Sequence, residues 1–143
     1  MSLERKPTLL GVDYGVVRVG LAASDPLGLT AQPVGAFPAK DPEVLLAEIA
    51  RLVNERNIRK VVVGLPLNMD GSEGPSVEGA RKLAGLIGER LGVEVVLWDE
   101  RLSTVRAERS MLERDLTRKQ RAKRIDTIAA QLILQSYLDS QPR

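Results

Sequence analysis

The chain has 143 residues, of which 43% are hydrophobic and 28% charged, and its formal net charge is +2. These values are ordinary for a soluble globular protein, and a chain of this length most often forms one domain. It contains no cysteine and no histidine, which excludes disulfides, thiolate nucleophiles, imidazole bases and His/Cys zinc sites.

The first part of the chain predicts three antiparallel strands joined by tight turns. Residues 8–12 and 18–24 are apolar strand patterns around a glycine-containing reversal, and residues 29–35 follow a turn signal. The third of these predicts an edge strand, because Pro33 has no backbone N–H to donate to a neighbour.

Helices and strands alternate along the rest of the chain, which predicts right-handed crossovers and parallel strand pairing. Asp41 followed by Pro42 marks the start of the first helix, and Gly92 marks the end of the second. The predicted elements are a helix over 42–57, a strand over 60–64, a helix over about 77–91, a strand over 93–98, a helix from Thr104 to about Leu112, and a largely buried helix over 125–138. Ser103 or Thr104 could cap the helix that begins at Thr104. The fold class is therefore α/β, with a mixed five-stranded sheet flanked by helices.

Positive charge is concentrated in one segment. Residues 101–124 contain nine Lys or Arg residues against three Asp or Glu residues, so this segment carries +6 and the rest of the chain −4. Such density is typical of a surface that binds a polyanion, although a salt-bridged helix face is the alternative. Residues 118–124 contain no acid that could pair with their cations, which favours phosphate binding. We expect this run to be a loop or a mobile helix end.

Three acids stand at positions where an α/β sheet binds ligands. Asp13 ends the first strand, Glu100 follows the last strand, and Asp126 lies in the first turn of the predicted last helix. Ligands collect outside the carboxyl ends of parallel strands, so these acids could share one crevice. Crowded carboxylates need a divalent cation or a proton to offset their repulsion. Without His or Cys, oxygen-bound Mg²⁺ or Mn²⁺ fits best, and such a site suits phosphodiester hydrolysis.

Each of these acids also has a structural interpretation. Asp13 could cap its turn, Glu100 could pair with Arg101 or Arg106, and Asp126 could favour the positive end of its helix dipole. These alternatives leave the excess of basic residues unexplained.

Four motifs along the chain resemble the bacterial YqgF family. They are GVDYG at residues 11–15, GLPLNMDGS at 64–72, WDERLST at 98–104 and IDTIAA at 125–130. The similarity extends from about Leu9 to Leu138. The family has a ribonuclease-H-like fold, and its members are described as Holliday junction resolvases or as nucleases that mature the small-subunit ribosomal RNA precursor. The resemblance implies one ribonuclease-H-like domain over 1–143, with a core over about 8–138 and the first strand central in the sheet.

The resemblance also implies the roles of individual residues. Asp13, Glu100 and Asp126 are expected to be the catalytic acids and to bind two Mg²⁺ or Mn²⁺ ions. Relatives often carry a polar residue and a lysine where this chain has Val16 and Val17, so the phosphate contact there is expected from the next arginine alone. The expected nucleic-acid contacts are Arg18, Asn68, Arg101, Thr104, Lys119, Arg121, Lys123 and Arg124.

The function expected from the sequence is that of a metal-dependent endonuclease acting on structured nucleic acid. Its partners would be RNA or branched DNA bound through the phosphate backbone, and pre-ribosomal particles. The alternatives are a non-catalytic RNA- or ribosome-associated protein with the same fold and, from the Asp-x-Gly opening, an actin-like ATPase, which would need a second such domain. We expect a cytoplasmic monomer or homodimer without a membrane segment.

Overall fold

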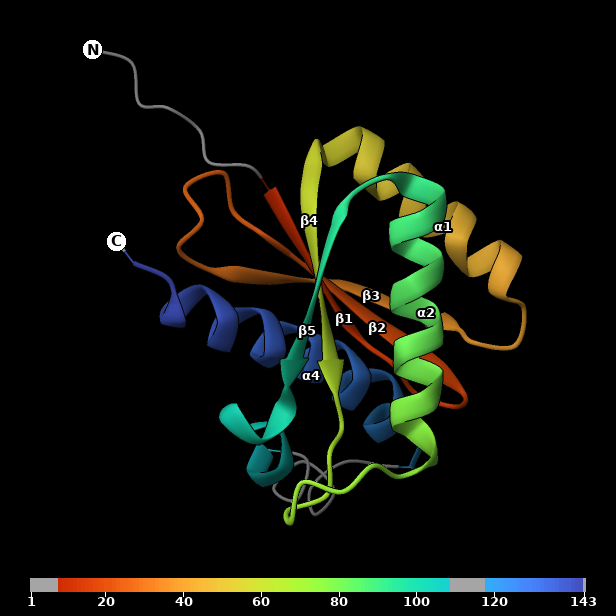
Figure 1. The fold of residues 1–143 in the computed structure, drawn as a ribbon, viewed down its shortest axis with the longest axis vertical. Helices are drawn as coiled ribbons and strands as arrows, with labels where there is room; N and C mark the ends of the chain where they lie inside the picture. Colours follow the sequence, from red (N-terminus) through yellow and green to blue (C-terminus); the bar gives the residue numbers. More distant parts are fainter. Residues whose placement is uncertain (1–7, 109–117, 143) are drawn as a thin grey trace.

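The computed structural model describes residues 8–108 and 118–142, with side chains described over 8–108 and 127–142. Within these ranges five strands form one sheet in the order β3-β2-β1-β4-β5 (Figure 1). The strands are β1 (Thr8–Asp13), β2 (Arg18–Ser24), β3 (Ala31–Pro38), β4 (Ile58–Leu65) and β5 (Glu94–Asp99). β1 is central, with the meander on one side and the later strands on the other, which confirms the predicted sheet.

The sheet is mixed, as predicted. β1 and β2 pair antiparallel, as do β2 and β3, whereas β1 with β4 and β4 with β5 pair parallel. β3 is an edge strand containing Pro33, but it begins two residues later than predicted and extends to Pro38. The reason is Asp25, whose Oδ1 accepts hydrogen bonds from the backbone N–H groups of Leu29 and Thr30 and holds both in the preceding turn.

Helices α1 (Pro42–Arg56) and α2 (Pro75–Leu91) cover one face of the sheet (Figure 1). Asp41 caps α1 as predicted, because its Oδ1 accepts from the N–H of Glu43 at 3.0 Å. Gly92 ends α2 with a φ of 64°, a left-handed conformation that favours glycine. The core on this face includes Leu10, Val12, Leu21, Ile49, Val61, Val63 and Ile87.

Helix α4 (Arg118–Ser140) covers the opposite face. It begins seven residues before the predicted start at Ile125, so the basic run over 118–124 is helical and not a loop. Asp126 therefore lies about two turns inside the helix and not in its first turn, which corrects the prediction. The pattern could not mark this start, because Lys, Arg and Gln favour helices without forming an apolar stripe.

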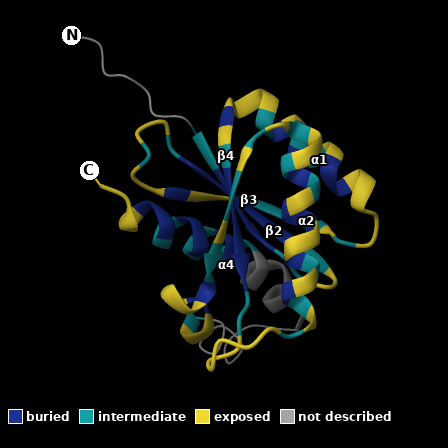
Figure 2. Ribbon diagram, in the orientation of Figure 1, coloured by how far each residue is buried: buried dark blue, intermediate teal, exposed yellow. Residues whose placement is uncertain are grey.

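The described side chains of α4 confirm that this part of the helix is largely buried. Residues 127–138 are all buried or half-buried (Figure 2). Ala130, Ile133, Leu134 and Leu138 are among the α4 side chains that pack into the core on this face. Among the described residues, no helix combines the length and apolar composition that crossing a bilayer requires.

Two glutamines join α4 to the edge strand. The Gln135 side chain accepts from the N–H of Ala31 at 2.9 Å, and the Gln131 side chain donates to the Ala31 carbonyl at 3.0 Å. These bonds satisfy backbone groups of β3 and fix α4 across the meander. Residues 105–108 form the start of a further helix, and its predicted end near Leu112 lies outside the described residues.

Candidate active site

Asp13 is the last residue of the central strand. Its exposed fraction is only 2%, and it pairs in register with Gly20 of β2. The turn that follows is tight, because a Cβ atom at Gly15 would lie 2.5 Å from the carbonyl oxygen of Arg18. A glycine is therefore required here, and the turn leaves Asp13 at the edge of the sheet where β1 ends.

The side chain of Asp13 belongs to the α4 face of the sheet. A Cβ atom at Gly11 would lie 2.7 Å from the Leu134 Cβ, so residue 11 faces α4, whereas Val12 packs in the core under α1 and α2. Successive residues of a strand point to opposite faces. Asp13 therefore faces the same side as Gly11.

Glu100 lies beside Asp13 on this face. It follows β5, is 3% exposed, and opens a 3₁₀ turn over Glu100–Leu102. Val12 pairs with Val63, so the next residue of β4, Gly64, is the neighbour of Asp13 in the sheet. A Cβ atom at Gly64 would lie 3.1 Å from the Glu100 Cγ. The two buried carboxylates thus come from strands on either side of β4 and share one face and one edge.

The backbone at Glu100 is held by the turn itself. The backbone N–H of Ser103 donates to the Glu100 carbonyl at 3.1 Å, and the Ser103 hydroxyl donates to the same oxygen at 2.7 Å. Ser103 therefore fixes the backbone position of Glu100. The sequence predicted Ser103 only as a possible helix cap.

Asp126 lies on α4 at the end nearest this edge. Farther along the helix, Tyr137 contacts Lys60 near the start of β4, whereas Ile133 lies against Gly64 near the end of β4. The helix therefore runs from the carboxyl ends of these strands towards their amino ends. Asp126 precedes the residues at Gly64 along this path, and its side chain lies outside the described residues.

The donor set at this edge fits a hard cation. The carboxylates of Asp13 and Glu100 supply oxygen ligands, which Mg²⁺ and Mn²⁺ prefer. Burial makes two adjacent negative charges costly unless a positive charge offsets them. Among the described side chains no three His, Cys, Asp or Glu residues gather into a ligand group, and the third predicted acid is outside that set.

Two arginines tie the loop over 66–74 to the end of β5. Arg101 makes an ion pair with Asp99, with an Nη2–Oδ2 distance of 2.8 Å, and its Nη1 donates to the Met69 carbonyl at 3.3 Å. Arg106 donates to the Leu67 carbonyl. The sequence suggested both arginines as partners of Glu100 and did not identify this role, which depends on two segments meeting in space.

The Asp99–Arg101 pair predicts a pH dependence. The pKa of the Asp99 carboxyl lies below its usual value, chiefly because Arg101 donates hydrogen bonds to it. A carboxyl group whose pKa is lowered by folding stabilises the folded state at pH values above its unfolded-state pKa. This stabilisation is lost as the pH falls through the folded-state pKa. We expect Arg101→Met to lower the urea midpoint near neutral pH, and the difference from the unsubstituted chain to shrink below about pH 4. A difference that stays constant from pH 7 to pH 3 would contradict this.

The predicted nucleic-acid contacts lie around the end of the sheet where β1 and β5 end. They differ in exposure and in hydrogen-bond partners. Arg18 is half-buried at the start of β2, and Thr104 is exposed just before the helix at 105. Asn68 closes a turn by donating from Nδ2 to the Ser72 hydroxyl at 2.9 Å. Arg101 is exposed and pairs with Asp99, as described above. The other four predicted contacts lie on α4, with side chains outside the described residues, and are Lys119, Arg121, Lys123 and Arg124.

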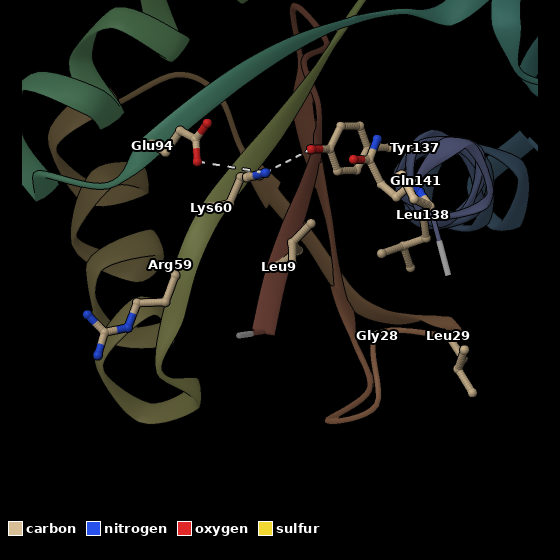
Figure 3. A pocket seen from close by; sticks show the side chains of 10 residues that line it. Leu9, Gly28, Leu29, Arg59, Lys60, Glu94, Tyr137, Leu138 and Gln141 are labelled. Atoms are coloured by element: carbon tan, nitrogen blue, oxygen red, sulfur yellow. Dashed lines mark hydrogen bonds and ion pairs between the residues drawn. The ribbon is translucent and has the colours of Figure 1, made fainter. Parts of the chain in front are cut away.

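A cavity of about 380 Å³ lies at the opposite edge of the sheet, where β1, β4 and β5 begin (Figure 3). Lys60 donates to the Tyr137 hydroxyl at 2.9 Å and lies 3.7 Å from a Glu94 carboxylate oxygen. The bond to Tyr137 is the chief reason that the pKa of Lys60 is raised. Lys60 and Glu94 thus pair with each other, and none of the predicted acids lines this cavity.

Comparison with known proteins places the chain in a family. The family model RuvX, described as Holliday junction resolvase, matches residues 7–140. A protein of Myxococcus xanthus is 50% identical over 131 residues, which cover 92% of this chain and 87% of the relative. One of Pelotomaculum thermopropionicum is 47% identical over 136 residues, covering 94% and 88%. Both are named "Putative pre-16S rRNA nuclease".

Solved structures share the fold at low sequence identity. T. thermophilus RuvC in complex with Holliday junction substrate has a TM-score of 0.59 at 15% identity, and the match covers 94% of this chain and 96% of that chain. The fowlpox virus Holliday junction resolvase has a TM-score of 0.54 at 14% identity, covering 94% and 99%. These likenesses confirm the ribonuclease-H-like fold. Since the family model spans nearly the whole described fold and the relatives are close in sequence, the chain belongs to the RuvX (YqgF) family of nucleases, hydrolases that cut phosphodiester bonds.

Proposed function

We propose that this chain is a metal-dependent endonuclease that cleaves structured RNA at the edge formed by the ends of β1 and β5. The observation that carries the proposal is that Asp13 and Glu100 are both buried, and that Gly64 of β4, the next residue after the Val12–Val63 pair, lies against the Glu100 side chain. Carboxylate oxygens are the ligands that Mg²⁺ and Mn²⁺ prefer, and the carboxyl ends of parallel strands are where α/β sheets bind ligands.

Asp13, Glu100 and Asp126 would hold Mg²⁺ or Mn²⁺, with two ions expected. Asp126 supports this assignment by its position, because it precedes Ala130 by four residues and Ile133 by seven, which are spacings of one helix face. Both of those residues contact the sheet beside the acids. When bound, two such ions would lower the pKa of an attacking water and stabilise the leaving oxygen.

The chain itself would bind and orient the substrate. Burial places the carboxylates of Asp13 and Glu100 in surroundings less polar than water, which strengthens their electrostatic interactions with a bound cation. Cationic and polar side chains would hold the flanking phosphates, which gives salt-dependent binding without sequence preference. We assign this role to Arg18, Asn68, Arg101, Thr104, Lys119, Arg121, Lys123 and Arg124.

The substrate that we propose is the precursor of 16S ribosomal RNA, cut near its 5′ end, and a partner would then be the pre-ribosomal particle. The support is the name carried by relatives at 50% and 47% identity. Branched DNA is the second candidate, because the family description is Holliday junction resolvase. Both substrates should be incubated with the protein side by side, and its mass in solution measured at the same concentration. Cleavage of the junction alone, by a dimer, would favour the second candidate.

Titration with metal tests the cofactor assignment. We expect saturable Mn²⁺ or Mg²⁺ binding in a calorimeter, and we expect Glu100→Gln to weaken it by about tenfold or more, since a charged oxygen ligand is removed. Glu89→Gln, on the exposed surface of α2, is the control and should bind as the unsubstituted chain does. Absence of saturable binding would support the alternative of a non-catalytic RNA- or ribosome-associated protein.

A further inference from the structure

Apolar side chains project into solvent around the proposed active site. Among the described residues, five large apolar side chains are at least 60% exposed. One of them, Val44, is on α1, and the other four are Val16 at 74%, Val17 at 69%, Met69 at 72% and Leu102 at 64%. These four, which we call the apolar rim, lie on the loops that follow β1, β4 and β5.

The three loops of the apolar rim begin at the end of the sheet that carries Asp13 and Glu100. Figure 1 shows the arrowheads of β4 and β5 pointing to the end of the molecule where the loops after both strands lie. Val16 follows Asp13 by three residues, and Leu102 follows Glu100 by two. The apolar rim and the buried acids therefore lie at the same end of the sheet.

The backbone of each loop is held in place by a hydrogen bond. The Val17 carbonyl accepts from the N–H of Ala39 at 2.9 Å, and the Met69 carbonyl accepts from Arg101 at 3.3 Å. The Leu102 carbonyl accepts from the Ser136 hydroxyl at 3.1 Å. Exposure of these apolar side chains is thus a property of ordered loops and not of fraying ends.

Apolar side chains beside a nuclease site cannot recognise phosphates. The apolar surfaces of a nucleic acid are the faces of its bases, which are hidden by stacking in a continuous helix and accessible at bulges, branches and single-stranded borders. Aromatic side chains usually make such contacts. Here they are committed elsewhere: Trp98 packs edge-on against Tyr137, Tyr14 lies against Gly79, and Phe37 packs on the core.

We propose that the apolar rim packs against unstacked nucleobases, so that the enzyme selects substrates whose helix is interrupted at the cleavage position. This inference rests on the proposed function and adds a specificity to it. Cations bind the backbone on any nucleic acid, whereas the apolar rim gains contacts only where base faces are exposed. Selectivity then comes from shape and not from base identity.

The test compares two RNAs that have the same sequence around the cleavage position. One is a hairpin with a three-nucleotide bulge there, and the other is its fully paired counterpart. We expect the unsubstituted chain to cleave the bulged RNA at least tenfold faster, and Met69→Ser or Leu102→Ser to lower that ratio by about tenfold. Val44→Ser, equally exposed but on α1, is the matched control and should keep the ratio.

A second measurement separates recognition from cleavage. Asp13→Asn protein is mixed with the bulged RNA carrying a fluorescent base analogue at the bulge, and the change of emission on binding reports the contact with that base. Loss of this change in Met69→Ser supports the proposal. Equal cleavage of both RNAs by the unsubstituted chain, or an unchanged ratio in both rim variants, would overturn it while leaving the nuclease assignment standing. If the protein is a dimer in solution and a rim variant is a monomer, the apolar rim is a subunit interface and the proposal that it contacts nucleobases is overturned.

Discussion

We expect Asp13→Asn to abolish cleavage and to leave RNA binding intact or tighter. The substitution keeps the size of the side chain but removes one negative charge from a site only 2% exposed. Charge stabilisation by a bound metal ion contributes several kcal/mol to such reactions, so we expect a loss of about a thousandfold or more in rate. Binding should not suffer, because the removed charge repels the phosphates of the substrate. Single-turnover cleavage and filter binding at one salt concentration measure the two effects.

The matched control for this substitution is Asp139→Asn, at an exposed position near the end of α4. It removes the same charge from the chain, yet it lies far along the helix from the acids, and we expect cleavage within about twofold of the unsubstituted rate. Equal loss of binding and cleavage in Asp13→Asn would indicate a disturbed structure and count against a catalytic role. An active Asp13→Asn would refute the site.

Gly64→Ala should damage both stability and activity although it adds a single methyl group. Its Cβ would lie 2.6 Å from the Ile133 Cδ1 and 3.1 Å from the Glu100 Cγ. Ile133 is fully buried, so relief of its contact requires α4 to shift, and the tighter contact with Glu100 requires that side chain to move as well. Overpacking of this kind costs about 1–3 kcal/mol in the free energy of unfolding. Because a displacement of about 1 Å can lower a rate a hundredfold, we expect cleavage to fall by about that factor.

Gly85→Ala is the control for the added methyl group. Gly85 lies within helix α2, and a Cβ atom there would meet nothing within 4 Å. Alanine favours a helix over glycine by about 0.5–1 kcal/mol, so urea unfolding should shift towards higher stability and cleavage should not change. If Gly64→Ala instead behaved like this control, the packing of Glu100 over β4 would be wrong.

Local signals in the sequence were sufficient for most of the fold. Asp41 before Pro42 and Gly92 after Leu91 marked helix ends correctly, because caps and left-handed residues act within a few residues of the chain. The continuous apolar run in β4 identified a strand covered on both faces. The central position of β1 came from the family resemblance and not from any local pattern, since strand order depends on pairing between distant segments.

Sequence patterns gave wrong predictions where a helix is formed by charged residues, or where a side chain pairs with a distant segment. The start of α4 was placed too late because Arg118 and its basic neighbours form a helix without an apolar stripe. By sequence alone Arg101 is a possible partner of Glu100. In the structure its guanidinium pairs with Asp99 and contacts the Met69 carbonyl, since the turn after β5 meets the loop after β4.

The sequence by itself determined the chemistry available to this protein. A chain without His or Cys is left with carboxylates, hydroxyls, Lys and Arg side chains, backbone amides and metal ions bound through oxygen. Only the tertiary structure decided that Asp13 and Glu100 lie on the same face of the sheet. Strand alternation assigns residues 11 and 13 to one side, but which side α4 occupies depends on packing. The absence of side chains at Gly11 and Gly64 lets that helix approach closely and leaves room for Glu100 beside the central strand.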